Sequence, residues 1–218
     1  MPSSVVFLGP SLPVEEAREI LDATYLPPIQ RGDLAQLPRE NPPAAVGIVD
    51  GRFLQSFSVS PKEVLKAMDA GIRFYGSSSM GALRAVELAR YGMIGVGQVF
   101  ELFASGELDA DDEVAMVFDQ SSFRPISDPL VNLRIALAEA HRQRVISEET
   151  RRLFIEEARR IYFPDRTFKR VLQSIENKIS AQEVQALREF LANAPDAKRD
   201  DAIQLLHEMK TYLDTLNA

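Results

Sequence analysis

The chain contains no cysteine, and its 218 residues include only two histidines, His141 and His207. Without cysteine it can form no disulfide, no zinc–thiolate or iron–sulfur site and no persulfide. The sequence has no apolar run near the ~20 residues of a membrane-spanning helix, and its start lacks the basic and apolar segments of a signal peptide. These absences predict a cytoplasmic protein without membrane contact, with few imidazoles to serve as general bases.

The charge distribution gives little indication of a nucleic-acid partner. The net charge is −7, and acidic residues outnumber basic ones by 17 to 9 within residues 1–120. A nucleic-acid-binding protein normally carries a strong basic excess on one segment or face. The most basic stretch, residues 142–170, is interleaved with glutamates, as in a solvated helix face. We therefore expect no nucleic-acid partner.

The first half of the sequence alternates between strand-like and helix-like segments. Four apolar runs predict buried strands: 4–8, 45–49, 72–75 and 113–118. Helices are expected after Ser11, where Pro13 would fall in the first turn, and from the capping box at Ser60 to Gly71. Further helices are expected at 81–90 and 97–105, whereas the proline-rich stretch 26–45 predicts an irregular connection. This alternation predicts an α/β fold, with a parallel sheet of about four strands and flanking helices.

From Pro129 onward the sequence is all-helical in pattern, which suggests a core at 1–128 and a helical segment at 129–218. The last helix carries a wide apolar stripe, formed by Ala202, Leu205, Leu206, Met209, Tyr212, Leu213 and Leu216. The stripe fits packing onto the body of the same chain, or contact with a partner or a second copy of the chain. A homo-oligomer through the C-terminal helices is therefore one expectation.

The chemically richest segment is the serine turn, Gly76-Ser77-Ser78-Ser79-Met80-Gly81, at the carboxyl end of the third predicted strand. Ligands bind at this edge of parallel sheets. A strand that leads through a tight turn into a helix resembles a nucleophile elbow, which needs small residues two positions either side of the nucleophile. Centred on Ser79, those residues are Ser77 and Gly81; centred on Ser78, they are Gly76 and Met80, which fits less well. The following helix N–H groups would form an oxyanion hole.

Two other interpretations of the serine turn remain open. The helix start could bind an anion, with Arg84 as the nearest fixed positive charge, although the lysine of a P-loop is missing. Alternatively, a serine before a helix can act only as its N-cap. For a catalytic triad, Asp112 or Asp119 could join His141, but a histidine in the last turn of a helix complements the helix dipole.

An acidic cluster before the fourth predicted strand, residues 109–113, is another possible source of a base or metal ligand. A charged turn is the simpler interpretation, and we expect neither a metal nor a cofactor.

Together, several motifs are similar to the TfuA-like family over roughly residues 7–140. The motifs are Phe7-Leu8-Gly9-Pro10-Ser11-Leu12, Pro27-Pro28-Ile29, Gly32-Asp33-Leu34, Ile48-Val49-Asp50-Gly51, the run from Gly76 to Leu88, Tyr91 to Gly97, Asp111 to Ala115 and Pro129 to Arg134. The resemblance implies an accessory role beside a YcaO enzyme, which uses ATP to activate a backbone amide for thioamidation. It further implies help with sulfide supply, for example by hydrolysis of a thiocarboxylated ubiquitin-like sulfur-carrier protein.

Because cysteine is absent, the chain cannot relay sulfur as a persulfide, but it could release sulfide from a donor or position donor and acceptor. We expect Ser79 to attack the thiocarboxylate, with Ser78 as the second candidate. The residues that could activate the nucleophile are Asp50, Glu87 and Glu113. The residues expected to bind substrate are Ser11, Gly76, Ser77, Gly81 and Arg84. The alternatives are a non-catalytic partner that recruits the sulfur donor and activates YcaO allosterically, and a structural scaffold.

Overall fold

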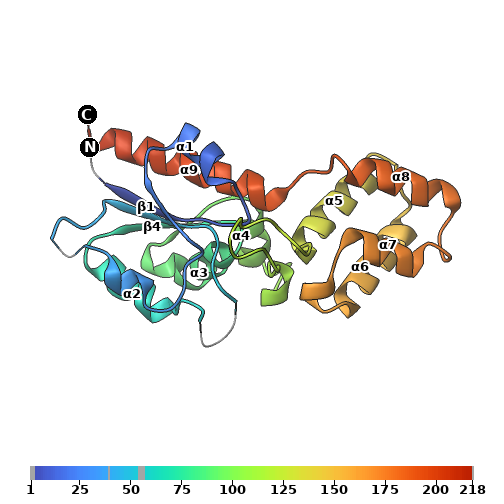
Figure 1. The fold of residues 1–218 in the computed structure, drawn as a ribbon, viewed down its shortest axis with the longest axis horizontal. Coiled ribbons are helices and arrows are strands. Elements are labelled where there is room, and N and C mark those ends of the chain that lie inside the picture. The colour runs from blue at the N-terminus through green and yellow to red at the C-terminus, as the bar shows by residue number, and fades with distance from the viewer. Residues whose placement is uncertain (1–2, 39, 54–56, 218) are drawn as a thin grey trace. The chain divides into compact units, whose positions relative to one another are not determined.

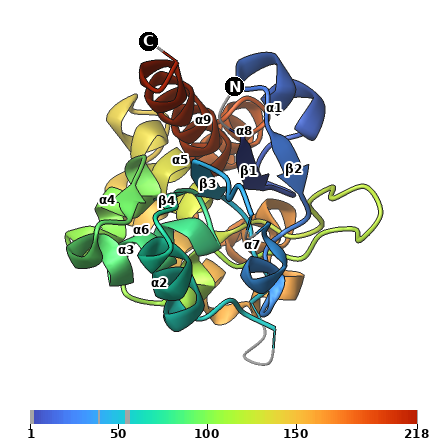
Figure 2. The same cartoon turned by 90° about the vertical axis from the view of Figure 1, so that its left-hand side faces the viewer.

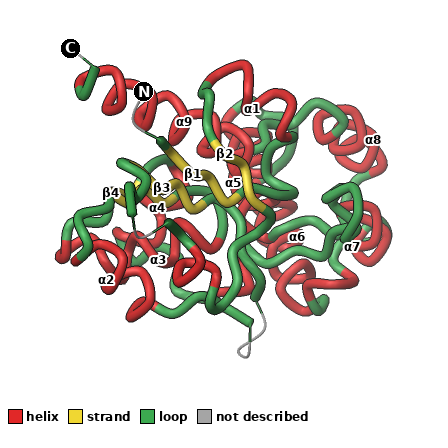
Figure 3. Tube along the Cα trace, turned by 60° about the vertical axis from the view of Figure 1, so that its left-hand side comes forward, coloured by secondary structure: helices red, strands yellow, loops and turns green. Residues whose placement is uncertain are grey.

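Five short strands form one parallel sheet in the computed structural model, which describes residues 3–38, 40–53 and 57–217. The strands are β1 (Ser4–Phe7), β2 (Thr24–Leu26), β3 (Ala45–Ile48), β4 (Arg73–Gly76) and β5 (Ile94–Gly95). Their order is β2-β1-β3-β4-β5, and every neighbouring pair is parallel. The short yellow segments in Figure 3 are these strands. This order is that of a doubly wound sheet whose direction of winding reverses between β1 and β3.

The chain forms two compact units, of which the first contains the sheet. This unit comprises residues up to Asp109 together with those from Lys198 onward, and Ala110–Ala197 form the second unit. The helices associated with the sheet are α1 (Val14–Ile20), α2 (Pro61–Asp69), α3 (Met80–Leu88), α4 (Gln98–Ala104) and α9 (Ala197–Thr215), with the 3-10 helices η1 (Asp33–Gln36) and η2 (Ala89–Tyr91). These elements confirm the predicted α/β fold with flanking helices.

Helices cover both faces of the sheet, as Figures 1 and 2 show. Side chains on a strand alternate between faces, so Val5 and Phe7 of β1 join one core cluster while Val6 joins the other. The first cluster packs against α2 and α3, and the second against α1 and α9.

The apolar stripe of α9 packs on this sheet. Ala202, Leu205, Leu206 and Met209 are fully buried in the second cluster. A Cβ on Gly47 of β3 would lie 2.7 Å from Met209 Sδ, so the missing side chain allows the close approach of α9. Packing within the chain therefore accounts for most of the stripe.

Local sequence explains where α2 begins and ends. The Ser60 hydroxyl accepts the Glu63 N–H, and the Glu63 carboxylate accepts the Ser60 N–H, which confirms the predicted capping box. Gly71, after the helix, has a φ of +88°, which glycine adopts without the steric penalty of a Cβ. The start of α1 differs from the prediction, because Pro13 occupies the N-cap position and Ser11 is engaged elsewhere.

The strand predicted at 113–118 is wrong. Asp111–Glu113 form the 3-10 helix η3 in the second unit, and Phe118 forms only an isolated bridge with Pro125. The apolar character of this run comes from burial of Val114 and Ala115 beside η3. In contrast, β2 and β5 are strands that the sequence analysis did not predict. They are three and two residues long, too short for a periodic pattern.

The second unit is helical. Its helices are α5 (Leu130–Arg142), α6 (Glu148–Arg160), α7 (Phe168–Ile175) and α8 (Ala181–Leu191), with the 3-10 helices η3 and η4 (Phe163–Asp165). They share an apolar core. In the described part of the chain, neither unit contains a helix long and apolar enough to cross a membrane.

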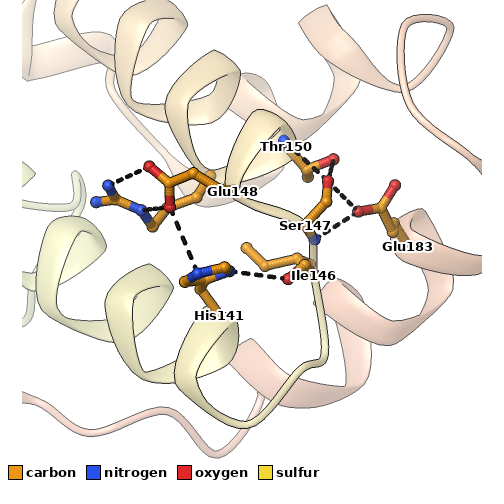
Figure 4. A network of polar contacts seen from close by, with 7 residues as sticks. His141, Ile146, Ser147, Glu148, Thr150 and Glu183 are labelled. Carbon is orange, nitrogen blue, oxygen red and sulfur yellow. Dashed lines mark hydrogen bonds and ion pairs between the residues drawn. The ribbon is translucent and has the colours of Figure 1, made fainter.

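Figure 4 shows how α6 is joined to α8. The Ser147 hydroxyl accepts the Thr150 N–H and so caps the start of α6. The Glu183 carboxylate of α8 accepts both the N–H and the hydroxyl of Ser147, at 2.8 Å each. Hydrogen bonds from Ser147, Thr150 and Ser180 outweigh the effect of burial and lower the pKa of Glu183 to about 2.

Candidate active site

The loops that follow β1 and β3 are joined by the buried carboxylate of Asp50. This carboxylate accepts hydrogen bonds from the Gly9 N–H at 3.0 Å, the Ser11 N–H at 3.0 Å and the Ser11 hydroxyl at 2.7 Å. The contact spans the point where the winding of the sheet reverses, at which such folds bind ligands. Asp50 and Ser11 thus lie where the sequence analysis expected them, but they form a contact that holds the loops together.

This contact gives a stability prediction. We expect Asp50→Ala to lower the free energy of unfolding by about 3 kcal/mol or more, because three buried donors lose their acceptor. Asp50→Asn is the matched control, with an expected loss of about 1 kcal/mol, since its amide can accept both N–H groups and donate to the Ser11 hydroxyl. Urea denaturation measures both values, and equal losses would contradict the role of the three donors.

The serine turn connects β4 to α3 through two closely packed glycines. The Gly81 N–H donates to the Val49 carbonyl at 3.3 Å. A Cβ on Gly81 would lie 1.7 Å from the Ile48 carbonyl oxygen, and one on Gly76 would lie 2.2 Å from the Gly81 carbonyl oxygen. Both glycines are therefore required because backbone crosses backbone at the carboxyl end of the sheet.

The serine side chains do not cap α3. Ser79 occupies the N-cap position, but its side chain forms no capping hydrogen bond. Ser78 has a φ of +61°, a left-handed conformation that is uncommon for residues other than glycine and often marks a functional turn. The three serines are fully or almost fully buried. Their burial and conformation argue against the interpretation of the turn as a simple helix start.

Instead, two of the serines contact Lys198, in the first turn of α9. The Lys198 Nζ lies 3.2 Å from the Ser79 Oγ, and the Ser78 hydroxyl donates to the Lys198 carbonyl at 2.7 Å. The Ser77 hydroxyl lies 3.1 Å from that of Ser78. Ser79 is 2 % exposed and Lys198 1 % exposed. The turn thus brings a hydroxyl and an amine together in a site excluded from bulk water.

Lys198 is a buried residue of this candidate site that sequence reasoning missed. It lies 119 residues beyond Ser79, in a charged segment typical of a solvated helix face. One indication was present, because Lys198 precedes Ala202, Leu205 and Met209 at helical spacing and so shares the apolar face of α9. A lysine on that face is directed toward the sheet.

Other predicted site residues have partners of their own. Arg84 donates from Nε to the Val59 carbonyl at 2.9 Å and forms an ion pair with Glu87. Glu113 belongs to the second unit, where Arg134 of α5 donates to both of its carboxylate oxygens, at 2.8 and 2.7 Å. These contacts within the protein account for the positions of Arg84, Glu87 and Glu113, and no ligand is needed to explain them.

Asp112 of the acidic cluster and the histidine His141 also have partners within the second unit. Asp112 forms an ion pair with the buried Arg166 at 2.8 Å. No group of three potential metal ligands occurs among the residues that the structure describes. His141 has Nδ1 3.3 Å from the Ile146 carbonyl oxygen and Nε2 3.6 Å from Glu148 (Figure 4).

Comparison with known families supports the resemblance seen in the motifs. The family model for TfuA-like proteins matches residues 50–167, more than half of the chain. The chain belongs to the TfuA-like family. Membership implies a role linked to thioamidation and suggests association with a YcaO enzyme. The matched range of this TfuA-like protein begins at Asp50 and includes the serine turn, whereas Lys198 lies beyond it. No curated protein matches the chain.

Proposed function

We propose that this TfuA-like protein hydrolyses a thiocarboxylated sulfur-carrier protein and releases sulfide for a YcaO partner. The observation that carries the proposal is the 3.2 Å contact between the Ser79 hydroxyl and the Lys198 amine, both buried at the carboxyl end of the sheet. Serine–lysine pairs are an established variant of the nucleophile–base arrangement. Lysine is suited to the base role in buried sites.

In the first step, the Ser79 oxygen attacks the carbonyl carbon of the thiocarboxylate while its proton passes to the Lys198 amine. The carbon–sulfur bond then breaks, and the proton leaves with sulfur as hydrosulfide. The product is an ester between Ser79 and the carrier. Sulfide leaves more readily than an amine would, so the step needs no strong acid beside the leaving group.

In the second step, water attacks the ester with Lys198 again accepting a proton. The carrier leaves as a carboxylate, Ser79 regains its proton, and one proton passes to solvent. The oxyanion of each step would face the first turn of α3, where Met80 follows the nucleophile. As the first residue of α3, Met80 has no carbonyl partner for its N–H within the helix.

The base role fits Lys198 better than the three acids considered from sequence. Asp50 accepts three hydrogen bonds, Glu87 is paired with Arg84, and Glu113 is held by Arg134. Lys198, by contrast, places its side-chain amine 3.2 Å from the Ser79 hydroxyl.

Burial also bears on the substrate. Because Ser79 is 2 % exposed, its hydroxyl is more accessible to the slender end of a chain than to an amide in the middle of a folded chain. This favours a C-terminal thiocarboxylate as the substrate.

We expect Ser78 to position Lys198 rather than to react. Its hydroxyl donates to a carbonyl, which cannot accept a proton as a base. Ser78→Ala should lower kcat for sulfide release about tenfold with KM unchanged, because one hydrogen bond that orients the base is lost. Ser77→Ala is the control, with a smaller effect. If sulfide release fell to the spontaneous rate in Ser78→Ala but was retained in Ser79→Ala, Ser78 would be the nucleophile and Ser79 the positioning residue.

The experiment that tests the proposed function is sulfide release from a thiocarboxylated carrier protein, measured with and without the YcaO partner. Release by the wild-type protein, above the rate of spontaneous hydrolysis, supports the hydrolase. Binding of the carrier without release under both conditions would contradict it and favour a non-catalytic partner that recruits the donor.

A further inference from the structure

A second buried acid of the first unit, Asp201, lies one turn along α9 from Lys198. Its carboxylate accepts the N–H groups of Gln98 and Val99, the first two residues of α4, at 2.8 Å each. Gly97 precedes α4 with a φ of +92°, and a Cβ there would lie 2.2 Å from the Asp201 carboxyl carbon. The start of α9 is therefore held to the start of α4 by a closely packed polar contact.

The start of α4 is in turn connected to the serine turn. The Val96 N–H donates to the Gly76 carbonyl at 2.9 Å, where β5 pairs with the end of β4. On the other side, the Lys198 amine contacts Ser79. Asp201 thus closes a ring of contacts that runs from the nucleophile's turn through β5 and α4 to α9 and back.

We infer that Asp201 is a positioning residue that sets the direction from which Lys198 meets Ser79. This inference rests on the proposed function, because it assigns Asp201 a part in that site. Asp201 acts through the helix. Lys198 and Asp201 are three residues apart on α9, and the Asp201 carboxylate holds the first turn of this helix in place. The apolar face of α9 and the ion pair between Arg199 and Glu16 hold the helix independently, so loss of the Asp201 contact should leave the helix docked.

The contact should depend on pH. Burial raises the pKa of Asp201 to about 6, and the negative charges of Asp200 on α9 and Glu101 on α4 add to the effect, while the bonds from Val99 and Gln98 oppose it. The ionised carboxylate accepts both N–H groups, whereas protonation converts one oxygen to a donor. Protonation near pH 6 should therefore change the hydrogen bonds at the first turn of α9. Because the pKa is raised, the buried position favours the protonated form, so the turn changes its contacts at low pH without coming loose.

The test compares Asp201→Asn with Asp200→Asn, which removes the same charge from an exposed neighbour. The readout is the NMR signal of the Lys198 side-chain carbon next to the amine in lysine-labelled protein, assigned by its absence in Lys198→Met. In wild type, this signal should shift with a midpoint near pH 6. In Asp200→Asn it should still shift, with a lower midpoint because one charge that raises the pKa of Asp201 is gone, and in Asp201→Asn the shift should vanish. Sulfide-release kcat should fall about tenfold in Asp201→Asn, with KM unchanged, and stay within twofold in Asp200→Asn.

Gly97→Ala should reproduce the Asp201→Asn phenotype, because the added Cβ displaces the carboxylate from the opposite side. If the Lys198 signal of the wild-type protein showed no inflection near pH 6, the inference would be overturned. This measurement is made on the wild-type protein alone, so it does not depend on whether a variant folds. A shift that persists in Asp201→Asn would also overturn it. Absence of sulfide release from the wild type, with the Lys198 shift present and lost in Asp201→Asn, would refute the hydrolase while leaving the positioning contact established.

Discussion

Replacing either member of the Ser79–Lys198 pair should nearly abolish sulfide release while leaving the protein folded. Ser79→Ala removes the atom that forms the ester, so the rate should fall to that of spontaneous hydrolysis. Lys198→Met keeps the length of an apolar stem and removes the amine, so kcat should fall by about 10²–10⁴-fold, the usual contribution of a general base. KM should change little, because neither group is assigned to carrier binding. Steady-state kinetics with a sulfide-specific probe measures both.

The pair should also behave as a unit. If Lys198 acts only by activating Ser79, the double variant should be no slower than Ser79→Ala, a marked failure of additivity. Lys210→Met is the matched control, since Lys210 lies exposed on the same helix. It should retain full activity. Ser79→Ala with wild-type turnover would contradict the mechanism, as would equal losses in Lys198→Met and Lys210→Met.

The sequence could predict those features that depend on neighbouring residues. The capping box at Ser60 and the serine turn at the end of a strand follow from short patterns, and the structure contains both. Asp50 also lies at the predicted strand end. The hydrogen bonds that its carboxylate accepts from Gly9 and Ser11 were not predictable, because those partners lie 41 and 39 residues away.

The contact between Lys198 and Ser79 could not be predicted for a related reason. Lys198 reaches Ser79 only because α9 returns to the sheet after the whole second unit, and no local pattern encodes that return. The fourth strand was wrongly predicted because an apolar run does not distinguish a strand from an irregular segment buried beside Glu113 and its partner Arg134. In both cases, tertiary contacts decide the outcome.

Gly81→Ala should abolish the native fold or destabilise it by about 3 kcal/mol or more, although helix propensity predicts the opposite sign. In an exposed helix, replacing glycine by alanine stabilises by about 1 kcal/mol. At Gly81, however, the new Cβ would lie 1.7 Å from the Ile48 carbonyl oxygen and 2.6 Å from its carbon, both backbone atoms that cannot rotate away. The sheet and α3 would have to separate. The free energy lost in packing is larger than the gain from the higher helix propensity of alanine.

Gly32→Ala separates this crowding from the general effect of losing a glycine. Gly32 has a φ of +92°, and no atom of the described residues beyond its chain neighbours lies within 4 Å of the place that a Cβ would take. Its replacement should therefore cost about 1–2 kcal/mol from backbone strain alone. Thermal and urea denaturation of both variants give the comparison. A Gly81→Ala protein as stable as wild type would show that β3 and α3 do not approach so closely, and the serine turn would then lack the support that places Ser79 beside Lys198.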